Sequence, residues 1–327
     1  MEAKIDGFPL KQLQPAKFSN PQFTASGEMR ATVDFVELRT LWFNTGTLCN
    51  LKCKHCYIES SPRNDRLVYL DTNDVCSYLD EIGRLNLPTE EIGFTGGEPF
   101  MNPDAINIIR STLLRGFHVL VLTNAMRPMM KLETPLLELR SQFGKSLSLR
   151  VSLDHHTQSL HDSERGDGSW EAALTGLQWL TNNDFSVSVA GRTLWNLNES
   201  TIRRDFANLF AEKRLSIDAY NSSELVIFPE MNPNDDVPEI TAACWKTLNQ
   251  NPANLMCANS RMVIKRSGDD KPHVIACTLL PYDTQFSISE SLADAHRSIT
   301  LNHPNCSKFC VLGGGSCSTR RDRAPSK

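Results

Sequence analysis

The stretch Cys49-Asn-Leu-Lys-Cys53-Lys-His-Cys56 places three cysteines within eight residues, in a C-x3-C-x2-C spacing. It follows a run of strand-forming residues, Val36–Asn44, and so lies where parallel α/β folds place their active sites. Three thiolates can hold three irons of a [4Fe-4S] cube and leave the fourth iron open to a ligand. A zinc site more often shows two C-x2-C pairs or a histidine at matching spacing. The spacing therefore favours an open-site iron–sulfur cluster over a structural zinc site or unrelated core cysteines.

A second motif, Gly96-Gly97-Glu98-Pro99, stands directly after the next predicted strand, Glu91–Thr95. Two glycines let the backbone approach a ligand closely. Their carbonyls and the Glu98 carboxylate can accept hydrogen bonds from an ammonium group. Alone, this motif could be an ordinary strand-to-helix turn. One β-α unit after the cysteines, it indicates a ligand site.

Strand-like and helical patterns alternate around these motifs. Six short apolar runs are typical of buried parallel strands: Val36–Asn44, Glu91–Thr95, His118–Thr123, Ser146–Leu153, Phe185–Thr193 and Glu224–Phe228. Between them, helical periodicity or helix-start signals mark four segments: Asp71–Asn86, the stretch after Pro103, Trp170–Leu180 and Glu199–Phe210. The alternation predicts a parallel sheet with helices outside it. Six units are too few for a closed eight-stranded barrel, so a partial barrel or a doubly wound sheet remains.

Together the two motifs resemble the signature of the radical S-adenosylmethionine (radical SAM) superfamily, over roughly Val36 to Pro229. The resemblance implies a partial (β/α)6 barrel in which Cys49, Cys53 and Cys56 ligate a [4Fe-4S] cluster. The amino and carboxylate groups of S-adenosyl-L-methionine would chelate the open iron. The resemblance assigns further cofactor contacts to His55, at the adenine-packing position, and to Gly96, Gly97, Glu98 and Pro99.

The sequence after the fourth predicted strand resembles the SPASM and twitch branch of that superfamily. Val151-Ser152-Leu153-Asp154 is followed by His161-Asp-Ser-Glu-Arg165-Gly166, an S-x-D…H-D-x-x-R-G pattern. By resemblance, Ser152, Asp154 and neighbouring polar groups contact the cofactor. Arg165 is either a fork for a carboxylate or a loop-stabilising residue. Weaker cofactor candidates are Asn124, Arg192 and Asn196, while His155 and His156 are expected to be loop residues.

A hairpin is predicted at Arg261–Arg266 and His273–Cys277. Two cysteines bracket it, Cys257 and Cys277, and three more follow it: Cys306, Cys310 and Cys317. SPASM modules carry more cysteines and hold two auxiliary clusters. This looser set suffices for one auxiliary [4Fe-4S] cluster, as in a twitch-like module, with structural zinc as the alternative. The sequence leaves open which four bind. The remaining cysteines, Cys76 and Cys244, are expected to be core residues.

Composition sets the remaining expectations. The chain has 327 residues and a formal charge of −4, which gives no general attraction to nucleic acid or membrane. It has neither a membrane-spanning apolar run nor a signal-like start, so a cytoplasmic location with reduced thiols is expected. We expect an N-terminal extension at 1–36, the barrel at 37–238 and a small Cys-rich module at 239–327. This module is too poor in apolar residues to be held together by a core of its own, so a bound metal is expected to stabilise it. A helix is expected at Glu239–Gln250, and a frayed C-terminus carries Arg320, Arg321 and Arg323.

The resemblance implies a radical enzyme. It would cleave S-adenosylmethionine reductively to a 5′-deoxyadenosyl radical, which abstracts a hydrogen atom from a substrate. An auxiliary cluster would assist oxidation or bind the substrate, and a flavodoxin or ferredoxin would supply electrons. Since only about 36 residues precede the barrel, a small metabolite is weakly favoured over a ribosomal peptide or protein. A non-catalytic iron–sulfur or zinc-stabilised binding protein is the alternative of another class.

Overall fold

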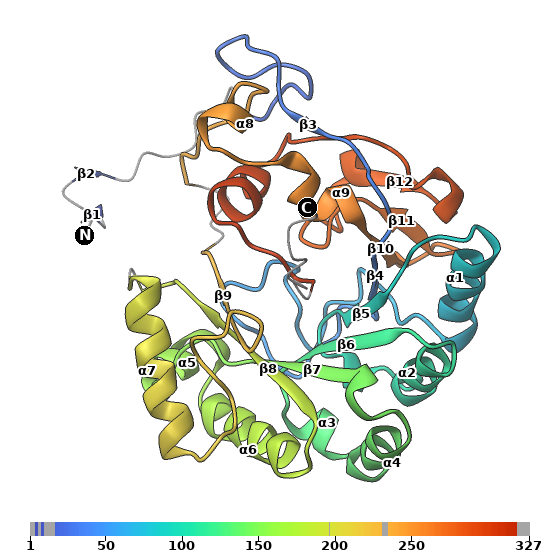
Figure 1. Ribbon diagram of the computed structural model, residues 1–327, viewed down its shortest axis with the longest axis vertical. Helices are drawn as coiled ribbons and strands as arrows, with labels where there is room; N and C mark the ends of the chain where they lie inside the picture. Colours follow the sequence, from blue (N-terminus) through green and yellow to red (C-terminus); the bar gives the residue numbers. More distant parts are fainter. Residues whose placement is uncertain (1–3, 6–7, 10–16, 196, 231–234, 319–327) are drawn as a thin grey trace, which may run out of the picture.

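A nine-stranded sheet forms the centre of the protein, in the strand order β12-β11-β10-β4-β5-β6-β7-β8-β9 (Figure 1). The computed structural model describes residues 4–5, 8–9, 17–195, 197–230 and 235–318. Neighbouring strands from β4 to β9 pair in parallel. The strands of this parallel part are β4 (Thr40–Asn44), β5 (Glu91–Thr95), β6 (His118–Thr123), β7 (Leu147–Ser152), β8 (Ser186–Arg192) and β9 (Leu225–Phe228). All six predicted strands are confirmed, and with them the partial barrel.

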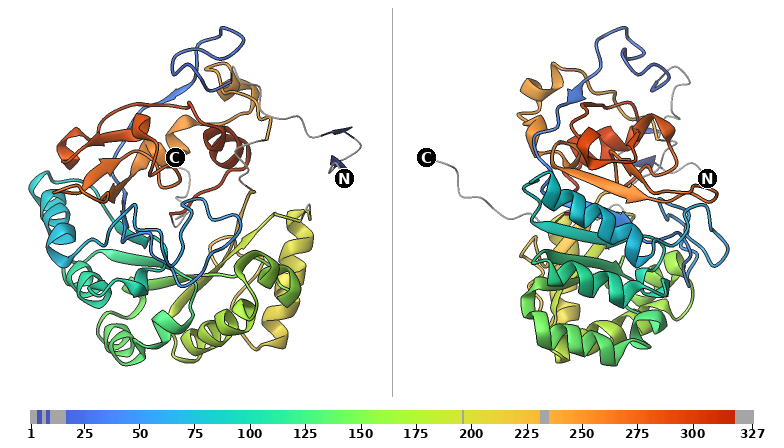
Figure 2. Two further views of the ribbon diagram at one scale, coloured as in Figure 1. Left: turned by 180° about the vertical axis from the view of Figure 1, so that it is seen from behind. Right: turned by 90° about the vertical axis from the view of Figure 1, so that its right-hand side faces the viewer.

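Helices lie outside this curved sheet, as Figures 1 and 2 show. They are α1 (Thr72–Arg84), α2 (Ala105–Leu114), α3 (Arg127–Met130), α4 (Glu133–Phe143), α5 (Gln158–Arg165), α6 (Ser169–Asn182) and α7 (Glu199–Glu212). The N-cap of α1 is Asp71, whose side chain accepts a hydrogen bond from the Asp74 backbone in a reciprocal capping box. Gly168, in the left-handed conformation, is the cap residue of α6, and Ser169 is its first residue.

Alternation along the strands gives the barrel two apolar layers. On β7, Leu149 and Val151 belong to the outer layer, between the sheet and the helices. The inner layer contains Trp42 of β4 and Leu120 of β6, packed with residues of the C-terminal region. Arg150 has the opposite side-chain direction to Leu149, as expected for a strand. The barrel interior is therefore filled partly by the C-terminal part of the chain.

The C-terminal region continues the barrel sheet. β10 (Ser260–Ile264) pairs in parallel with β4, and the predicted hairpin to β11 (His273–Ile275) is present, followed by β12 (Ser287–Ser289). The sequence predicted a module without a core of its own. In the structure this region shares the inner apolar layer with the barrel. A π-helix, Cys306–Leu312, lies beside β9, with the Phe309 and Phe228 rings 5.6 Å apart.

The predicted helix at Glu239–Gln250 is wrong in length, since only α8 (Cys244–Thr247) is helical there. A further short helix is α9 (Met256–Asn259).

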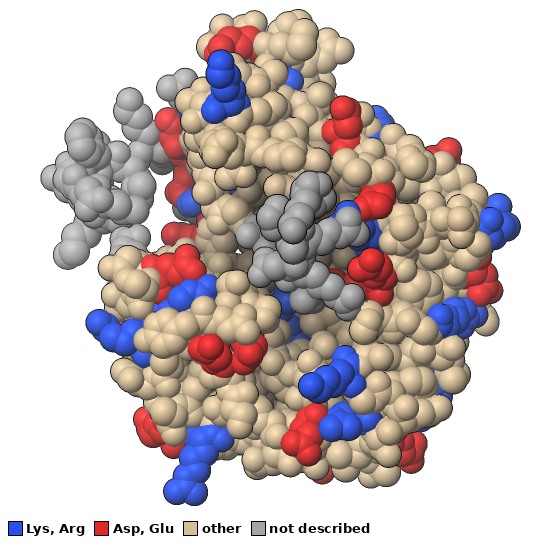
Figure 3. Space-filling view, viewed as in Figure 1, with Lys and Arg blue, Asp and Glu red and all other residues tan. Residues whose placement is uncertain are grey.

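The N-terminal part contributes β1 (Lys4–Ile5), β2 (Phe8–Pro9) and β3 (Thr32–Val33), the last paired with β13 (Ile299–Thr300). No helix of the described residues is long and apolar enough to cross a membrane. Figure 3 shows acidic and basic side chains interspersed over one face.

Candidate active site

A cavity lies at the carboxyl ends of the barrel strands and holds about 1020 Å³ of space, counted to its open mouth. The structure brings most of the candidate residues from the sequence together in its wall: Cys49, Cys53, His55, Cys56, Gly96, Gly97, Asn124, Ser152, Asp154, Arg165 and Arg192. Glu98 and Pro99 do not line it. Asn196 and the basic tail at 319–327 lie outside the described residues.

The cysteine loop runs between β4 and α1. The backbone N–H of Cys49 donates to the Ser61 carbonyl at 3.1 Å, which closes the loop on itself. Backbone N–H groups also donate to two sulfurs, from Leu51 to Cys49 at 3.4 Å and from Ser60 to Cys56 at 3.3 Å. Burial raises the pKa of Cys49 to about 12. Three buried or half-buried thiols on one cavity wall, two with N–H donors at sulfur, fit a thiolate-ligated cluster that displaces the protons.

The two motif glycines admit the backbone of the cysteine loop. Gly97 N–H donates to the Gly46 carbonyl at 2.8 Å, and Glu98 N–H donates to the Leu48 carbonyl at 3.1 Å. A Cβ on Gly97 would lie 2.1 Å from the Leu48 carbonyl oxygen. Gly96 has φ +149°, and its Cβ would lie 2.5 Å from the Gly46 carbonyl oxygen. The sequence predicted glycines for the approach of a ligand, whereas the structure shows that another stretch of backbone already approaches them.

Glu98 lies beneath the cavity and joins the ends of β5 and β6. Its Oε1 accepts hydrogen bonds from Thr123 Oγ1 at 2.8 Å and Phe100 N at 3.2 Å, and its Oε2 accepts one from Asn124 N at 2.8 Å. Burial raises the pKa of Glu98 to about 7, against the opposing effect of these donors. The carboxylate is thus engaged by the protein. It positions the motif and Asn124 rather than facing the cavity.

Glu98→Gln is expected to flatten the pH dependence of stability of the metal-free protein. A pKa raised on folding means that the folded state binds this proton more tightly than the unfolded state. The stabilisation is complete below about pH 4.5 and is lost as pH rises through about 7. It amounts to about 3 kcal/mol at most. Urea unfolding of both proteins from pH 4.5 to 8 measures it, and equal slopes would contradict the prediction.

Asp154 and Arg165 form a buried pair across the cavity wall. Arg165 Nε donates to Asp154 Oδ2 at 2.7 Å and Nη2 donates to Oδ1 at 2.9 Å. Burial alone would raise the pKa of Asp154, but Arg165 holds it below its usual value. The sequence left two roles open for Arg165, a fork for a carboxylate or a loop-stabilising residue. In the structure Arg165 does hold a carboxylate, and that carboxylate belongs to the protein. The charge of Arg165 also acts on Cys53, which places a cation beside the cysteine loop.

Glu164 is a positioning residue that sequence reasoning missed. One carboxylate oxygen accepts from His55 N at 2.8 Å and from Arg192 Nη1 at 3.2 Å, and the other lies 2.6 Å from His55 Nδ1. Its backbone carbonyl accepts from Lys54 N at 2.9 Å. Glu164 therefore fastens the cysteine loop to α5 and β8. Because His55 and Glu164 are 109 residues apart, no local pattern could show their contact.

Asn124 contacts the cysteine loop, whereas His155 and His156 lie away from the cavity. Asn124 Nδ2 donates to Asn50 Oδ1 at 2.9 Å and lies 3.9 Å from Cys49 Sγ, so it reaches the cysteine loop. His155 and His156 stack with ring centroids 4.1 Å apart and do not line the cavity. Burial lowers the pKa of His155 to about 4, so the ring is neutral at pH 7.

The C-terminal region supplies a wall of the same cavity, which the sequence did not reveal. Leu279, Phe309 and Cys317 line it together with Phe228 of β9 and Tyr57 of the cysteine loop. Burial raises the pKa of Tyr57 above its usual value, and the charges of Cys317, Cys56 and Cys277 raise it further.

Four of the C-terminal cysteines form a mutually coupled set: Cys257, Cys277, Cys306 and Cys310. Cys257 acts on the thiol of Cys277, both act on Cys306, and all three act on Cys310, so that each raises the pKa of the next. Cys317 also acts on Cys277 and Cys310. Burial raises the pKa of Cys257 to about 11 and of Cys277 to about 12. Among the described residues no group of three or more His, Cys, Asp and Glu is arranged to hold a single metal ion.

The chain belongs to the radical SAM superfamily, whose family profile matches residues 43–208. The family predicted from the motifs is confirmed. Two solved structures share the fold: Streptococcus suis SuiB bound to S-adenosylmethionine and anSMEcpe with bound AdoMet. Their TM-scores are 0.56 and 0.55, each at 12% identity, over 78% and 82% of this chain and 64% and 82% of theirs.

Curated relatives include two proteins named for maturation or biosynthesis and one named as a heme synthase. The subtilosin biosynthesis protein AlbA of Bacillus subtilis is 32% identical over 156 residues, 46% of this chain and 33% of AlbA. The mycofactocin maturase MftC of Mycobacterium tuberculosis is 30% identical over 46% of this chain and 38% of MftC. The AdoMet-dependent heme synthase of Methanosarcina barkeri is 28% identical over 58% of this chain and 51% of its own length. The matches thus span a third to a half of these relatives.

Proposed function

We propose that this protein is a radical SAM enzyme with an open-site [4Fe-4S] cluster on Cys49, Cys53 and Cys56. The observation that carries the proposal is the single cavity into which the three cysteines, the two motif glycines and the Asp154–Arg165 pair all face. When bound, the cluster and S-adenosylmethionine supply a 5′-deoxyadenosyl radical that removes a hydrogen atom from the substrate. The barrel wall excludes water from that chemistry.

The protein's own residues orient the cofactor in this proposal. Gly96 and Gly97 line the cavity together with the cysteine loop, and their carbonyls would receive the ammonium group of the cofactor. Ser152, Asn124 and Arg192 present polar groups at the ends of β7, β6 and β8. Glu98 and Glu164 act through other residues, since one holds the ends of β5 and β6 together and the other holds the cysteine loop.

We propose a peptide or protein substrate. The maturation and biosynthesis relatives AlbA and MftC support this alternative over the small metabolite favoured from the sequence. The SuiB fold has also been solved with its precursor peptide SuiA. The similarity to a heme synthase supports the small molecule as the second candidate. Electrons would come from a flavodoxin or ferredoxin. All ten cysteines are described and unpaired, which supports a reducing, cytoplasmic setting.

Anaerobic reconstitution tests the proposal. The reconstituted protein is expected to cleave S-adenosylmethionine to 5′-deoxyadenosine and methionine when dithionite supplies electrons, and faster when the peptide substrate is present. A protein that carries iron and sulfide but makes no 5′-deoxyadenosine would reject the enzyme. A zinc-loaded protein without iron would favour the binding-protein alternative.

A second [4Fe-4S] cluster on Cys257, Cys277, Cys306 and Cys310 predicts about eight irons per chain. Replacing Cys277 and Cys310 by Ser should lower this to about four and spare the first cluster. Because β10 is part of the barrel sheet and pairs with β11, we expect β10 and β11 to stay protected from proteolysis in this variant. Cys76→Ser is the control and should keep all the iron, while four irons with one zinc in the wild type would reject the redox role.

A further inference from the structure

The radical-SAM cavity has a polar side and an apolar side, which come from different parts of the chain. The polar side is the cysteine loop with the ends of β5, β6 and β7, and it carries most of the proposed cofactor contacts. The apolar side, here called the apolar wall, consists of Leu122 of β6, Ala190 of β8, Phe228 of β9, and Leu279 and Phe309 of the C-terminal region. None of the proposed cofactor contacts belongs to the apolar wall.

The two aromatic rings of the apolar wall are held in place by their neighbours. The centroids of the Phe228 and Phe309 rings lie 5.6 Å apart, with 32° between the ring planes. A Cβ on Gly315 would lie 2.5 Å from Cε1 of Phe309, so the backbone at Gly315 already lies against this ring. A surface that is packed from behind keeps its shape when a ligand binds, so the apolar wall can select a substrate by fit.

The charged side chains of the cavity are already paired within the protein. Asp154 and Arg165 form the two-bonded pair described above, and Arg192 Nη1 lies 3.2 Å from Glu164 Oε1. Among the described residues that line the cavity, no Asp, Glu, Lys or Arg is left without a partner of opposite charge. A charged substrate side chain would therefore lose its hydration here and find no free counter-charge, which is costly.

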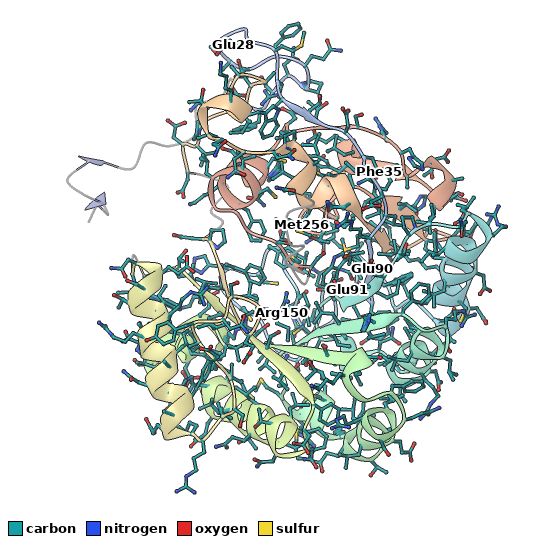
Figure 4. All side chains as sticks on the ribbon, in the orientation of Figure 1. Glu28, Phe35, Glu90, Glu91, Arg150 and Met256 are labelled. Atoms are coloured by element: carbon teal, nitrogen blue, oxygen red, sulfur yellow. The ribbon has the colours of Figure 1, made fainter. Side chains whose placement is uncertain are left out.

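The buried charge lower in the barrel is separated from this cavity. Arg150 lines a second cavity together with Ser316 and Ser318, whereas Cys317, between these two serines, lines the first. Arg150 Nη1 donates to the Cys317 carbonyl at 2.5 Å, and the charge of Glu91 acts on Arg150. Figure 4 shows Arg150 and Glu91 on the strands of the barrel. Arg150 therefore does not serve as a counter-charge for a substrate in the first cavity.

We propose that the substrate places an apolar side chain, aliphatic or aromatic, against the apolar wall and that the hydrogen atom is taken from this side chain. This inference rests on the proposed function and names the class of substrate for the same cavity. One C–H bond of the side chain breaks and one forms at the 5′ carbon of the deoxyadenosyl radical. The hydrogen atom moves with its electron, so the substrate carbon keeps one unpaired electron. Burial of apolar surface against the wall supplies the binding free energy.

Four acetylated tripeptide amides, glycine-X-glycine, test the proposal, with side-chain-deuterated leucine, phenylalanine, lysine or glutamate at X. Calorimetry measures their binding to the reconstituted protein with S-adenosylmethionine and no reductant. After dithionite is added, mass spectrometry measures deuterium in the 5′-deoxyadenosine. The leucine and phenylalanine peptides are expected to bind and to transfer deuterium at least about tenfold better than the lysine and glutamate peptides, because the wall offers a buried charge no partner.

Phe228→Lys adds a cation to the apolar wall at a half-buried position. It should keep the iron content of the wild type, lower deuterium transfer from the leucine and phenylalanine peptides about tenfold and raise transfer from the glutamate peptide. Leu114→Lys is the matched control, since it adds the same charge on α2, where the side chain is 63% exposed. This control should match the wild type with all four peptides.

Equal binding and transfer with all four peptides, or a preference for the charged ones, would overturn the inference. So would 5′-deoxyadenosine that carries deuterium from none of them, and each of these results leaves the enzyme assignment intact. An unchanged preference in Phe228→Lys with full iron would overturn the role of the apolar wall. If this variant loses iron, the preference of the wild type among the peptides decides. A wild-type protein that makes no 5′-deoxyadenosine would instead reject the proposed function, and this inference with it.

Discussion

Cys53→Ala is expected to abolish the formation of 5′-deoxyadenosine and to lower the iron content from about eight to about four per chain. Cys49, Cys53 and Cys56 act as a unit, because the loss of one thiolate leaves an iron of the cube without its ligand. Cys53 lies on the cavity wall, beside the charge of Arg165. Among the described residues the other cysteine that lines this cavity is Cys317, whose carbonyl accepts a hydrogen bond from Arg150.

The control for Cys53→Ala is a variant of a cysteine that lies outside both proposed cluster sites. Cys76→Ala, in the middle of α1, removes a thiol and should leave iron and cleavage unchanged. The measurement is iron and sulfide per chain, together with 5′-deoxyadenosine formed under dithionite. Retained cleavage in Cys53→Ala would reject the three-cysteine assignment. Loss of all iron would instead show that the two sites load as one.

The parallel strands could be predicted because their signal is local. Each run that became β4 to β9 is a short apolar segment flanked by turns or helical periods, and buried parallel strands need little else. The C-x3-C-x2-C loop and the glycine motif could be predicted for the same reason, because each is a short continuous stretch of sequence. Arg165 and Asp154 were flagged one by one, but their mutual pairing became visible only in the structure.

Contacts between distant segments account for what the sequence did not show. Glu164 binds the cysteine loop across 109 residues, and Arg150 binds Cys317 across 167. The helix expected at 239–250 is shorter because tertiary packing, not periodicity alone, decides such a segment. Likewise the C-terminal region looked too poor in apolar residues to fold, since its partners Trp42 and Leu120 lie on barrel strands.

Gly97→Ala is expected to disrupt both the cluster and cofactor binding. The added methyl group would lie 2.1 Å from the Leu48 carbonyl oxygen and 2.7 Å from that of Thr47. These are backbone atoms, which cannot rotate away as the end of a side chain can. Relief of the overlap moves the segment that leads into Cys49. Overpacking of this kind typically costs about 1–3 kcal/mol.

This expectation differs from the one that the motif alone suggests. If Gly97 served only the approach of a ligand, a methyl group there would weaken S-adenosylmethionine binding and leave the iron in place. The packing against Leu48 predicts that first-cluster iron falls as well, together with the free energy of unfolding. Gly83→Ala is the matched control, since its Cβ meets nothing within 4 Å, and an alanine in α1 should be neutral or favourable by about 1 kcal/mol. Iron analysis, calorimetry with S-adenosylmethionine and urea unfolding separate the two cases. Full iron with weakened cofactor binding would contradict this prediction. It would show that the cysteine loop tolerates the methyl group and that Gly97 serves the approach of the ligand.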